Sequence, residues 1–188
     1  LPRAWASALY EDTAGQLHAA GAGHLHRFDG RRFVRERVLA ALPPETPVYT
    51  ARATSDGAVW LGASTGLWRV TASGEERVGI DTVVMTVVDD GRGHLWVGSR
   101  RGLHRVEIAP RPGARRSLLH FGPGSGLDGG DFSYPAWPRG VRSPDGALAL
   151  SSNAGLAVVD PARVSQPPRP PRALVESVTI DGRPAAQN

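Results

Sequence analysis

The sequence predicts an all-β protein, and three observations lead to that prediction. Its 188 residues include 23 glycines and 16 prolines, which favour many turns between short strands over long helices. Continuous apolar, β-branched runs such as Val83 to Val88 are typical of strands that are buried on both faces. The third observation is a unit that occurs four times along the chain, which is typical of repeat architectures.

The four copies align on the glycine that opens the second strand of each copy, at Gly15, Gly57, Gly93 and Gly146. They read GQLHAAGAGHLHRF, GAVWLGASTGLWRV, GHLWVGSRRGLHRV and GALALSSNAGLAVV. Each period has room for four antiparallel strands, which is the pattern of β-propeller blades. We therefore predict about four four-stranded blades within residues 1–162, at approximately 1–41, 42–81, 82–122 and 123–162.

Three columns of this alignment indicate how a blade is built. The sixth position is always small, which favours close approach of a neighbouring backbone. The second turn has glycines, where positive φ is easy only for glycine, and a leucine follows in every copy. The fourth position holds His18, Trp60, Trp96 and Ala149, and a large flat ring there can cover the neighbouring sheet. The turn glycines are Gly66, Gly102 and Gly155, and the leucines are Leu25, Leu67, Leu103 and Leu156.

Innermost strands are expected before the aligned glycines, at Trp5 to Asp12, Val48 to Ser55, Val83 to Asp89 and Arg139 to Ser143. Outer strands are expected at Arg31 to Val38, Glu75 to Ile80 and Arg115 to Phe121. Copy one places Gly23 a residue early, so its second turn is expected to differ.

The composition of the sequence changes after the fourth copy of the repeat. Residues 163–172 are rich in proline, which cannot donate a ladder of N–H groups, so we predict an extended connector. Residues 173–188 contain one alternating strand pattern followed by Asp181-Gly182, a turn pair. That strand either closes the last blade or begins another domain.

Composition excludes several function classes. The formal net charge is +4, but all 22 basic residues are arginines scattered without interleaved aromatics, so nucleic-acid binding is not predicted. The absence of cysteine excludes disulfides, cysteine zinc sites and thiol catalysis. No signal peptide, membrane span or cofactor-binding loop is evident, and because the chain begins at Leu1 we expect it to be part of something longer.

Two of the copies, DDGRGHLWVGSRRGLHRV and SDGAVWLGASTGLWRV, resemble the two-component regulator propeller repeat. The segment FGPGSGLDGGDFSYPAW, followed by PDGALALSSNAGLAVVDP, is similar to the closing segment of such propellers. The sequence RALVESVTIDGRP resembles the first strand of the Y-Y-Y domain, the small β-sandwich that connects the propeller to the membrane in this family. The resemblance covers nearly the whole chain.

The resemblance implies an extracytoplasmic, periplasmic sensor propeller of a bacterial membrane-bound regulator, with contact to the membrane only through parts that this chain lacks. It also implies a ring of about seven blades, of which this chain would be the C-terminal portion. Such a fragment exposes two blade faces, so we expect self-association through them.

Histidines and acidic pairs are interpreted as structural rather than catalytic. His18 fills the slot of Trp60 and Trp96, and no carboxylate is expected to complete a zinc-like set near it, so no metal site is predicted. The pairs Glu11-Asp12 and Asp89-Asp90 stand at the same turn in two copies, which favours turn chemistry over acid-base catalysis. No catalytic residue is predicted, and the recurring arginines, Arg27, Arg69 and Arg105, are assigned a structural role.

A ligand surface, where there is one, is expected in the loops before the innermost strands, at Pro43 to Pro47, Asp81 to Val83 and Asp128 to Trp137. The candidate binding residues are Tyr134, Trp137, Asp131 and Asp81, with a small molecule or glycan as the partner. The favoured function is a non-enzymatic sensor. A protein-interaction scaffold and a propeller lyase or hydrolase are the alternatives.

Overall fold

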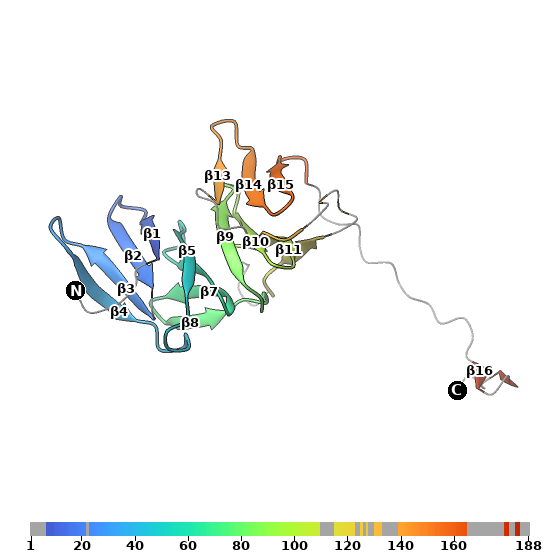
Figure 1. Cartoon of the computed structure of the whole chain (residues 1–188), viewed down its shortest axis with the longest axis horizontal. Coiled ribbons are helices and arrows are strands. Elements are labelled where there is room, and N and C mark those ends of the chain that lie inside the picture. Colours follow the sequence, from blue (N-terminus) through green and yellow to red (C-terminus); the bar gives the residue numbers. More distant parts are fainter. Residues whose placement is uncertain are drawn as a thin grey trace.

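The computed structural model describes residues 7–21, 23–109, 115–122, 125, 127, 130–132 and 139–164, and the backbone of 179–180 and 183–184. These residues form an all-β structure of antiparallel sheets arranged as propeller blades (Figure 1). Within each blade, strands that follow one another in the chain pair with one another, so each blade is an up-and-down meander. The fold class predicted from the repeats is therefore confirmed.

Three blades have four strands each and the fourth has three described strands. Blade 1 contains β1 (Ala8–Glu11), β2 (Leu17–Gly21), β3 (His24–Phe28) and β4 (Phe33–Val38). Blade 2 contains β5 (Val48–Ala53), β6 (Val59–Ala63), β7 (Gly66–Thr71) and β8 (Gly74–Arg77). Blade 3 contains β9 (Val84–Asp89), β10 (His94–Ser99), β11 (Gly102–Glu107) and β12 (Leu118–Phe121), and blade 4 contains β13 (Gly140–Arg142), β14 (Leu148–Ser152) and β15 (Gly155–Val159).

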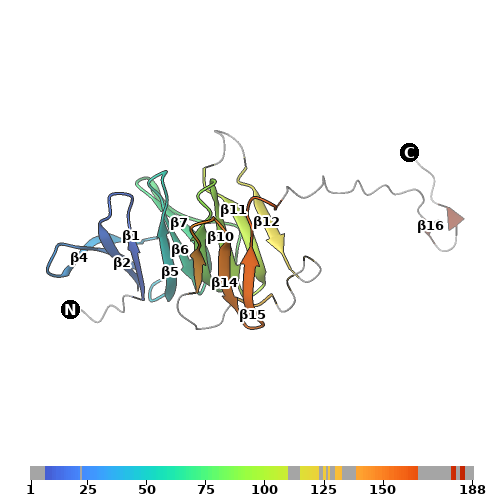
Figure 2. The same cartoon turned by 90° about the horizontal axis from the view of Figure 1, so that it is seen from above.

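The first strand of each blade is its innermost strand. Strands β1 and β5, β5 and β9, and β9 and β13 contact one another between neighbouring blades. Figure 2 shows the blades following one another side by side in chain order. The Arg139 side chain, just before β13, donates at 2.8 Å to the carbonyl of Tyr49 in β5, which ties blade 4 to blade 2 on the inner side.

The hydrophobic core lies between the blades rather than in one centre. Three clusters of buried side chains fill the spaces between blades 1 and 2, blades 2 and 3, and blades 3 and 4. Strand β9 is buried on both faces over Val84–Val88, as the continuous apolar run predicted, because blades 2 and 4 pack on either side of it. The interior of each blade thus depends on the next one for burial.

The turn glycines adopt the conformation that their columns require. Gly66, Gly102 and Gly155 have φ angles of 131°, 125° and 130°. In blade 1 the glycine stands one residue earlier, and Gly23 has a φ of 75°, so its turn differs as the sequence predicted. The small sixth position is explained by close packing, because a Cβ added to Gly62 would lie 2.9 Å from the Val84 carbonyl oxygen of the next blade.

The outer strands are shorter than the sequence predicted. Strand β8 ends at Arg77 rather than Ile80, because Gly79 has a φ of 43° and the chain turns so that the buried Ile80 side chain enters the core. Strand β12 begins at Leu118 rather than Arg115. The Arg116 side chain instead turns inward and lies over the ring of Trp60.

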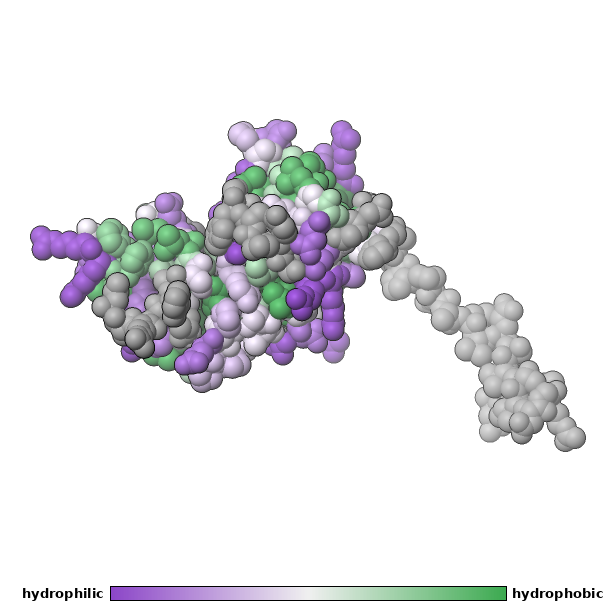
Figure 3. Space-filling model, viewed as in Figure 1, coloured by the Kyte–Doolittle hydropathy of each residue, from purple (hydrophilic) through white to green (hydrophobic). Residues whose placement is uncertain are grey.

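Blade 4 leaves one face uncovered by the described residues. The leucine that follows the turn glycine is buried in the first three blades, but Leu156 is 65% exposed. Val141 and Val158 lie on the same face, because both flank Ala149 across the sheet, and both are exposed. Figure 3 shows this face as an apolar surface at the top of the molecule.

The end of the chain contributes a short hairpin of β16 (Thr179–Ile180) and β17 (Arg183–Pro184). Strand β16 pairs with β17 and not with the sheet of β13 to β15. No helix of the described residues has the length and hydropathy needed to cross a membrane.

Candidate functional site

The aspartate at the first turn of blades 1 and 3 organises both the turn and the ring that follows it. Asp12 Oδ1 accepts backbone N–H groups of Ala14 and Gln16 at 2.9 Å, and Asp90 Oδ1 does the same for the equivalent residues of blade 3. These bonds confirm turn chemistry for Asp12 and Asp90 of the two acidic pairs. The second carboxylate oxygen holds the ring at the fourth position of the repeat, because Trp96 Nε1 donates to Asp90 Oδ2 at 3.3 Å.

His18 occupies the tryptophan position of blade 1 and keeps the same contact. Its Nε2 lies 3.2 Å from Asp12 Oδ2. The fourth-position ring faces the following blade, and Trp60 and Trp96 fill that space almost completely, with 0% and 1% exposure. A cavity of about 470 Å³ adjoins the smaller imidazole of His18 between blades 1 and 2.

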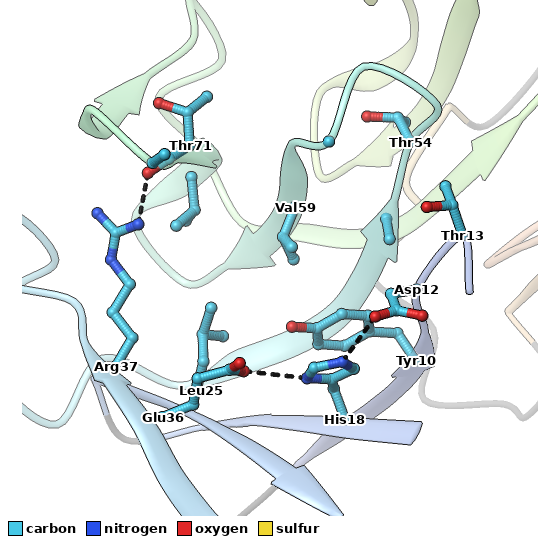
Figure 4. A pocket seen from close by; sticks show the side chains of 14 residues that line it. Tyr10, Asp12, Thr13, His18, Leu25, Glu36, Arg37, Thr54, Val59 and Thr71 are labelled. Atoms are coloured by element: carbon cyan, nitrogen blue, oxygen red, sulfur yellow. Dashed lines mark hydrogen bonds and ion pairs between the residues drawn. The ribbon is translucent and has the colours of Figure 1, made fainter. Parts of the chain in front are cut away.

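The cavity is lined by turns and strand ends of both blades (Figure 4). Blade 1 contributes a polar wall and blade 2 contributes mainly an apolar one. The lining residues on which the chemistry depends are Tyr10, Asp12, His18, Glu36, Leu25 and Val59. The cavity lies at the carboxyl ends of the innermost strands β1 and β5, opposite the loops in which the sequence led us to expect a ligand surface.

His18 is fixed from three sides. The Tyr10 ring stacks on the imidazole with centroids 5.1 Å apart and an interplanar angle of 13°. Asp12 Oδ2 lies 3.2 Å from Nε2, and Glu36 Oε2 lies 3.2 Å from Nδ1. Nδ1 is nevertheless without a hydrogen bond among the described residues, so the Glu36 oxygen lies close to it but off the line of N–H donation.

Glu36 reaches the cavity because of an irregularity in the sheet. Arg35 pairs with His26 and Arg37 pairs with Leu25, and the register shifts between these two pairs. Glu36 is the extra residue of this bulge, and a bulge re-aims the side chain that it carries. A regular alternation would not have predicted that Glu36 and His18 meet.

The Tyr10 hydroxyl is the unusual polar group of the cavity. The residue is 7% exposed, and its hydroxyl is not among the buried polar atoms that lack a hydrogen bond in the described part of the chain. Figure 4 shows it pointing into the space between Leu25 and Val59. Burial, followed by the charges of Glu36 and Asp12, raises the pKa of Tyr10 well above its usual range, so the hydroxyl stays neutral and able both to donate and to accept.

The Arg37 guanidinium pairs with groups of blade 2 rather than with polar groups of the cavity. Its guanidinium donates to Glu75 Oε1 at 2.6 Å and to the backbone carbonyl of Thr71, both in blade 2. The Asp12 carboxyl has its pKa lowered, chiefly by the N–H of Gln16 and also by His18, so it remains ionised near neutral pH.

The sequence did not predict the carboxylates that lie beside His18. Asp12 and Glu36 both contact it, because the turn and the bulge bring together residues that the sequence separates. Among the described residues, no group of three or more histidine and acidic side chains has an arrangement that could hold a metal ion. The missed signal was the spacing of Asp12 and His18, which repeats that of Asp90 and Trp96.

The candidate binding residues from the sequence are not brought to this cavity. Asp81 is exposed in the loop before β9 and forms an exposed ion pair with Arg101 at 3.4 Å. Asp131 is half-buried, and its carbonyl accepts the N–H of Asn153. Tyr134 and Trp137 lie outside the described residues, so their predicted role is untested.

A buried serine-histidine pair in blade 3 is part of a turn rather than a reactive centre. Ser99 Oγ lies 2.9 Å from His104 Nε2, but Ser99 is 0% exposed. Burial, together with the nearby His120, lowers the pKa of His104 to about 4, so its imidazole is neutral. Ser152 makes the same turn contact with the Gly155 carbonyl in blade 4 that Ser99 makes with Gly102 in blade 3, which indicates a repeat feature.

The recurring arginine column contributes to packing in blade 2. Arg69 donates to Asp56 at 2.9 Å and to Glu76 at 3.3 Å. Its guanidinium lies 5.8 Å from the centroid of the Trp60 ring, and that of Arg116 lies 5.0 Å from it. The Trp60 ring therefore makes cation–π contacts with two guanidinium groups.

No protein-family model matches the sequence, and no curated protein matches it. Solved structures are similar to it. One is the extracellular domain of BT4673 of B. thetaiotaomicron, a proposed one component system, with a TM-score of 0.66, 20% identity and 86% of this chain covered. Another is the extracellular domain of BT3049 of the same organism, a proposed hybrid two component system, with a TM-score of 0.65, 15% identity and 86% of this chain covered.

A virginiamycin B lyase from Staphylococcus aureus is also similar, with a TM-score of 0.53, 13% identity, and coverage of 84% of this chain and 57% of the lyase. The chain spans only 21% of the BT4673 structure and 22% of the BT3049 structure. At these identities the likeness shows the β-propeller fold and nothing finer.

Proposed function

We propose that the chain is a non-enzymatic sensor segment of an extracytoplasmic β-propeller in a bacterial membrane-bound regulator of the two-component type. The observation that carries this proposal is the likeness to the extracellular domain of BT4673 over 86% of the chain. The repeat motifs support it, because their order resembles that of the two-component regulator propeller. The buried Ser99 and His104 pair adds no support for an enzyme, since a reactant has no access to it.

In this proposal the signal is a small molecule, and the cavity between blades 1 and 2 is a place to bind it. The cavity's volume is within the range of ligand pockets, and its mixture of apolar walls and a few convergent polar groups is typical of them. The loops that contain Asp81, Asp131, Tyr134 and Trp137 are a second candidate surface, suited to a glycan or other flat ligand.

The location can be tested with a single cysteine in the full-length protein after any cysteine outside this chain has been replaced, because the chain itself has none. Ser73 is exposed in the turn between β7 and β8, so a Ser73→Cys variant of the full-length protein should react with a membrane-impermeant maleimide in cells whose outer membrane is permeabilised. Ser99→Cys, at a buried position, is the matched control and should not react. Labelling of Ser73→Cys only after cell lysis would contradict an extracytoplasmic location.

The proposed parent is a ring of about seven blades in which both end faces of this segment are covered. Blade 4 exposes Val141, Leu156 and Val158 on one face, and blade 1 exposes Leu9 and Val38 at the other end. Apolar surface of this kind on a sheet face favours association with another sheet.

The isolated chain is therefore expected to self-associate, and the double variant Leu156→Glu, Val158→Glu should shift it toward monomer, because two carboxylates would lose their water in the contact. Sedimentation velocity over a range of concentrations measures the shift. Arg32→Glu, an exposed change in blade 1 away from this face, should leave association unchanged. A wild-type chain that is monomeric at high concentration would refute this expectation.

A further inference from the structure

The cavity between blades 1 and 2 adjoins the position at which one copy of the repeat departs from the others. Trp60 and Trp96 are almost fully buried at this position in the later blades, and a hollow of about 480 Å³ between blades 2 and 3 is not lined by Trp60. The hollow of about 470 Å³ between blades 1 and 2 is lined by His18, so its chemistry rather than its size distinguishes it.

Two polar groups at the cavity are placed to form hydrogen bonds with a ligand. The Tyr10 side chain is 7% exposed, and its hydroxyl points into the cavity (Figure 4). A neutral hydroxyl can accept a hydrogen bond from a ligand that enters the cavity. Glu36 stands on the same wall with its side chain 44% exposed, so its carboxylate is open to a ligand.

The charged groups of the cavity wall determine whether a cationic or an anionic ligand is favoured. Asp12 and Glu36 are both carboxylates, and the nearby cation, Arg37, is bound to Glu75 and the Thr71 carbonyl. His18 is held between the two carboxylates through its ring nitrogens. The wall therefore has an excess of negative charge, which favours a cation that also donates hydrogen bonds.

Aliphatic side chains from both blades select the rest of the ligand. Leu25, Val59 and Val70 line the cavity and present aliphatic surface. A hydrated metal ion gains nothing from such a wall, whereas a short alkyl chain does. We propose that this cavity binds a primary ammonium group on a short alkyl chain, with the ammonium at Glu36 and the Tyr10 hydroxyl and the alkyl chain against Leu25 and Val59. This inference rests on the proposed function, since it names the ligand class of the sensor pocket.

The probe is n-butylammonium, titrated into the full chain and followed by NMR shifts of backbone amides. We expect saturable binding, with shifts at residues that line the cavity. The matched probes are n-butanol, which is neutral and of the same length, and butyrate, which is an anion. Both should bind at least about tenfold more weakly, because a charge-assisted hydrogen bond is lost.

Substitutions of three residues that line the cavity test whether n-butylammonium binds there. Tyr10→Phe should weaken n-butylammonium binding about fivefold and Glu36→Gln about tenfold. Glu11→Gln changes a carboxylate on the opposite, exposed face of β1 and should leave binding unchanged. His18→Trp should abolish binding while unfolding occurs at the same or higher urea concentration, because an indole fills the cavity and can still donate to Asp12.

The outcomes separate the inference from the proposed function. Equal binding of n-butanol, or unaltered n-butylammonium binding by His18→Trp, would overturn the ammonium proposal and leave the sensor assignment standing. A cytoplasmic location of Ser73→Cys would overturn the sensor assignment itself, whatever the probe does.

Discussion

Replacing Gly66 by alanine is expected to lower the free energy of unfolding by about 4 kcal/mol, through backbone strain and overpacking together. Gly66 has a φ of 131°, which an alanine rarely adopts, and a Cβ added there would lie 2.1 Å from the Ile80 carbonyl oxygen. That carbonyl cannot easily move, because it accepts the N–H of Leu67 at 3.1 Å. For a chain of this length, the loss corresponds to a fall in Tm on the order of 10 °C.

Gly155 is a matched control for this variant, because it occupies the same column of the repeat. Its φ is 130°, but no atom of the described residues lies within 4 Å of an added Cβ. Gly155→Ala should therefore show the backbone strain alone, about 1–3 kcal/mol. Urea unfolding of the two variants measures the difference, and equal losses would show that the contact with Ile80 does not constrain the turn.

Trp60→Ala is expected to lower the unfolding free energy by about 3–5 kcal/mol, the usual cost of truncating a fully buried large aromatic side chain. Trp60 is 0% exposed and packs in the cluster between blades 2 and 3. Its removal also takes away the ring over which Arg69 and Arg116 lie. Urea unfolding at neutral pH measures the loss.

A comparison of phenylalanine variants tests the reason for this loss. Trp60 Nε1 has no hydrogen-bond partner among the described residues, so Trp60→Phe sacrifices packing only. Trp96→Phe also breaks the bond to Asp90, whose carboxylate has 2% side-chain exposure and would be left without that donor. We therefore expect Trp96→Phe to be the more destabilising change by about 1–3 kcal/mol. The reverse order would mean that the Asp90 contact contributes little.

The repeat explains why so much of the fold was predictable. Glycine and aspartate at fixed turn positions leave the backbone few alternatives, and residues such as Gly102 and Asp90 behave as their columns require. The outer strands were predicted less well, because their ends depend on where Ile80 and Arg116 find burial in the neighbouring blade. That information is not contained in the strand's own sequence.

The candidate cavity was not predictable in the same way. His18 was identified as a residue in a tryptophan column, yet its partners come from a turn and from a bulge. The bulge that turns Glu36 toward His18 depends on how β3 and β4 register, and a shift of one residue would send the side chain to the other face. The residues of the cavity thus come together through pairing, not through spacing.

The sequence by itself determined the all-β class, the blade repeat, the turns and the innermost strands, because local backbone preferences and two-residue alternation act within each copy. Only the tertiary structure decided which faces are buried and which remain open. The same leucine column is buried at Leu103 and exposed at Leu156, since blade 4 covers Leu103 whereas none of the described residues covers Leu156. The space beside His18 has the same origin: a cavity is a property of two packed blades, and neither blade's sequence contains it alone.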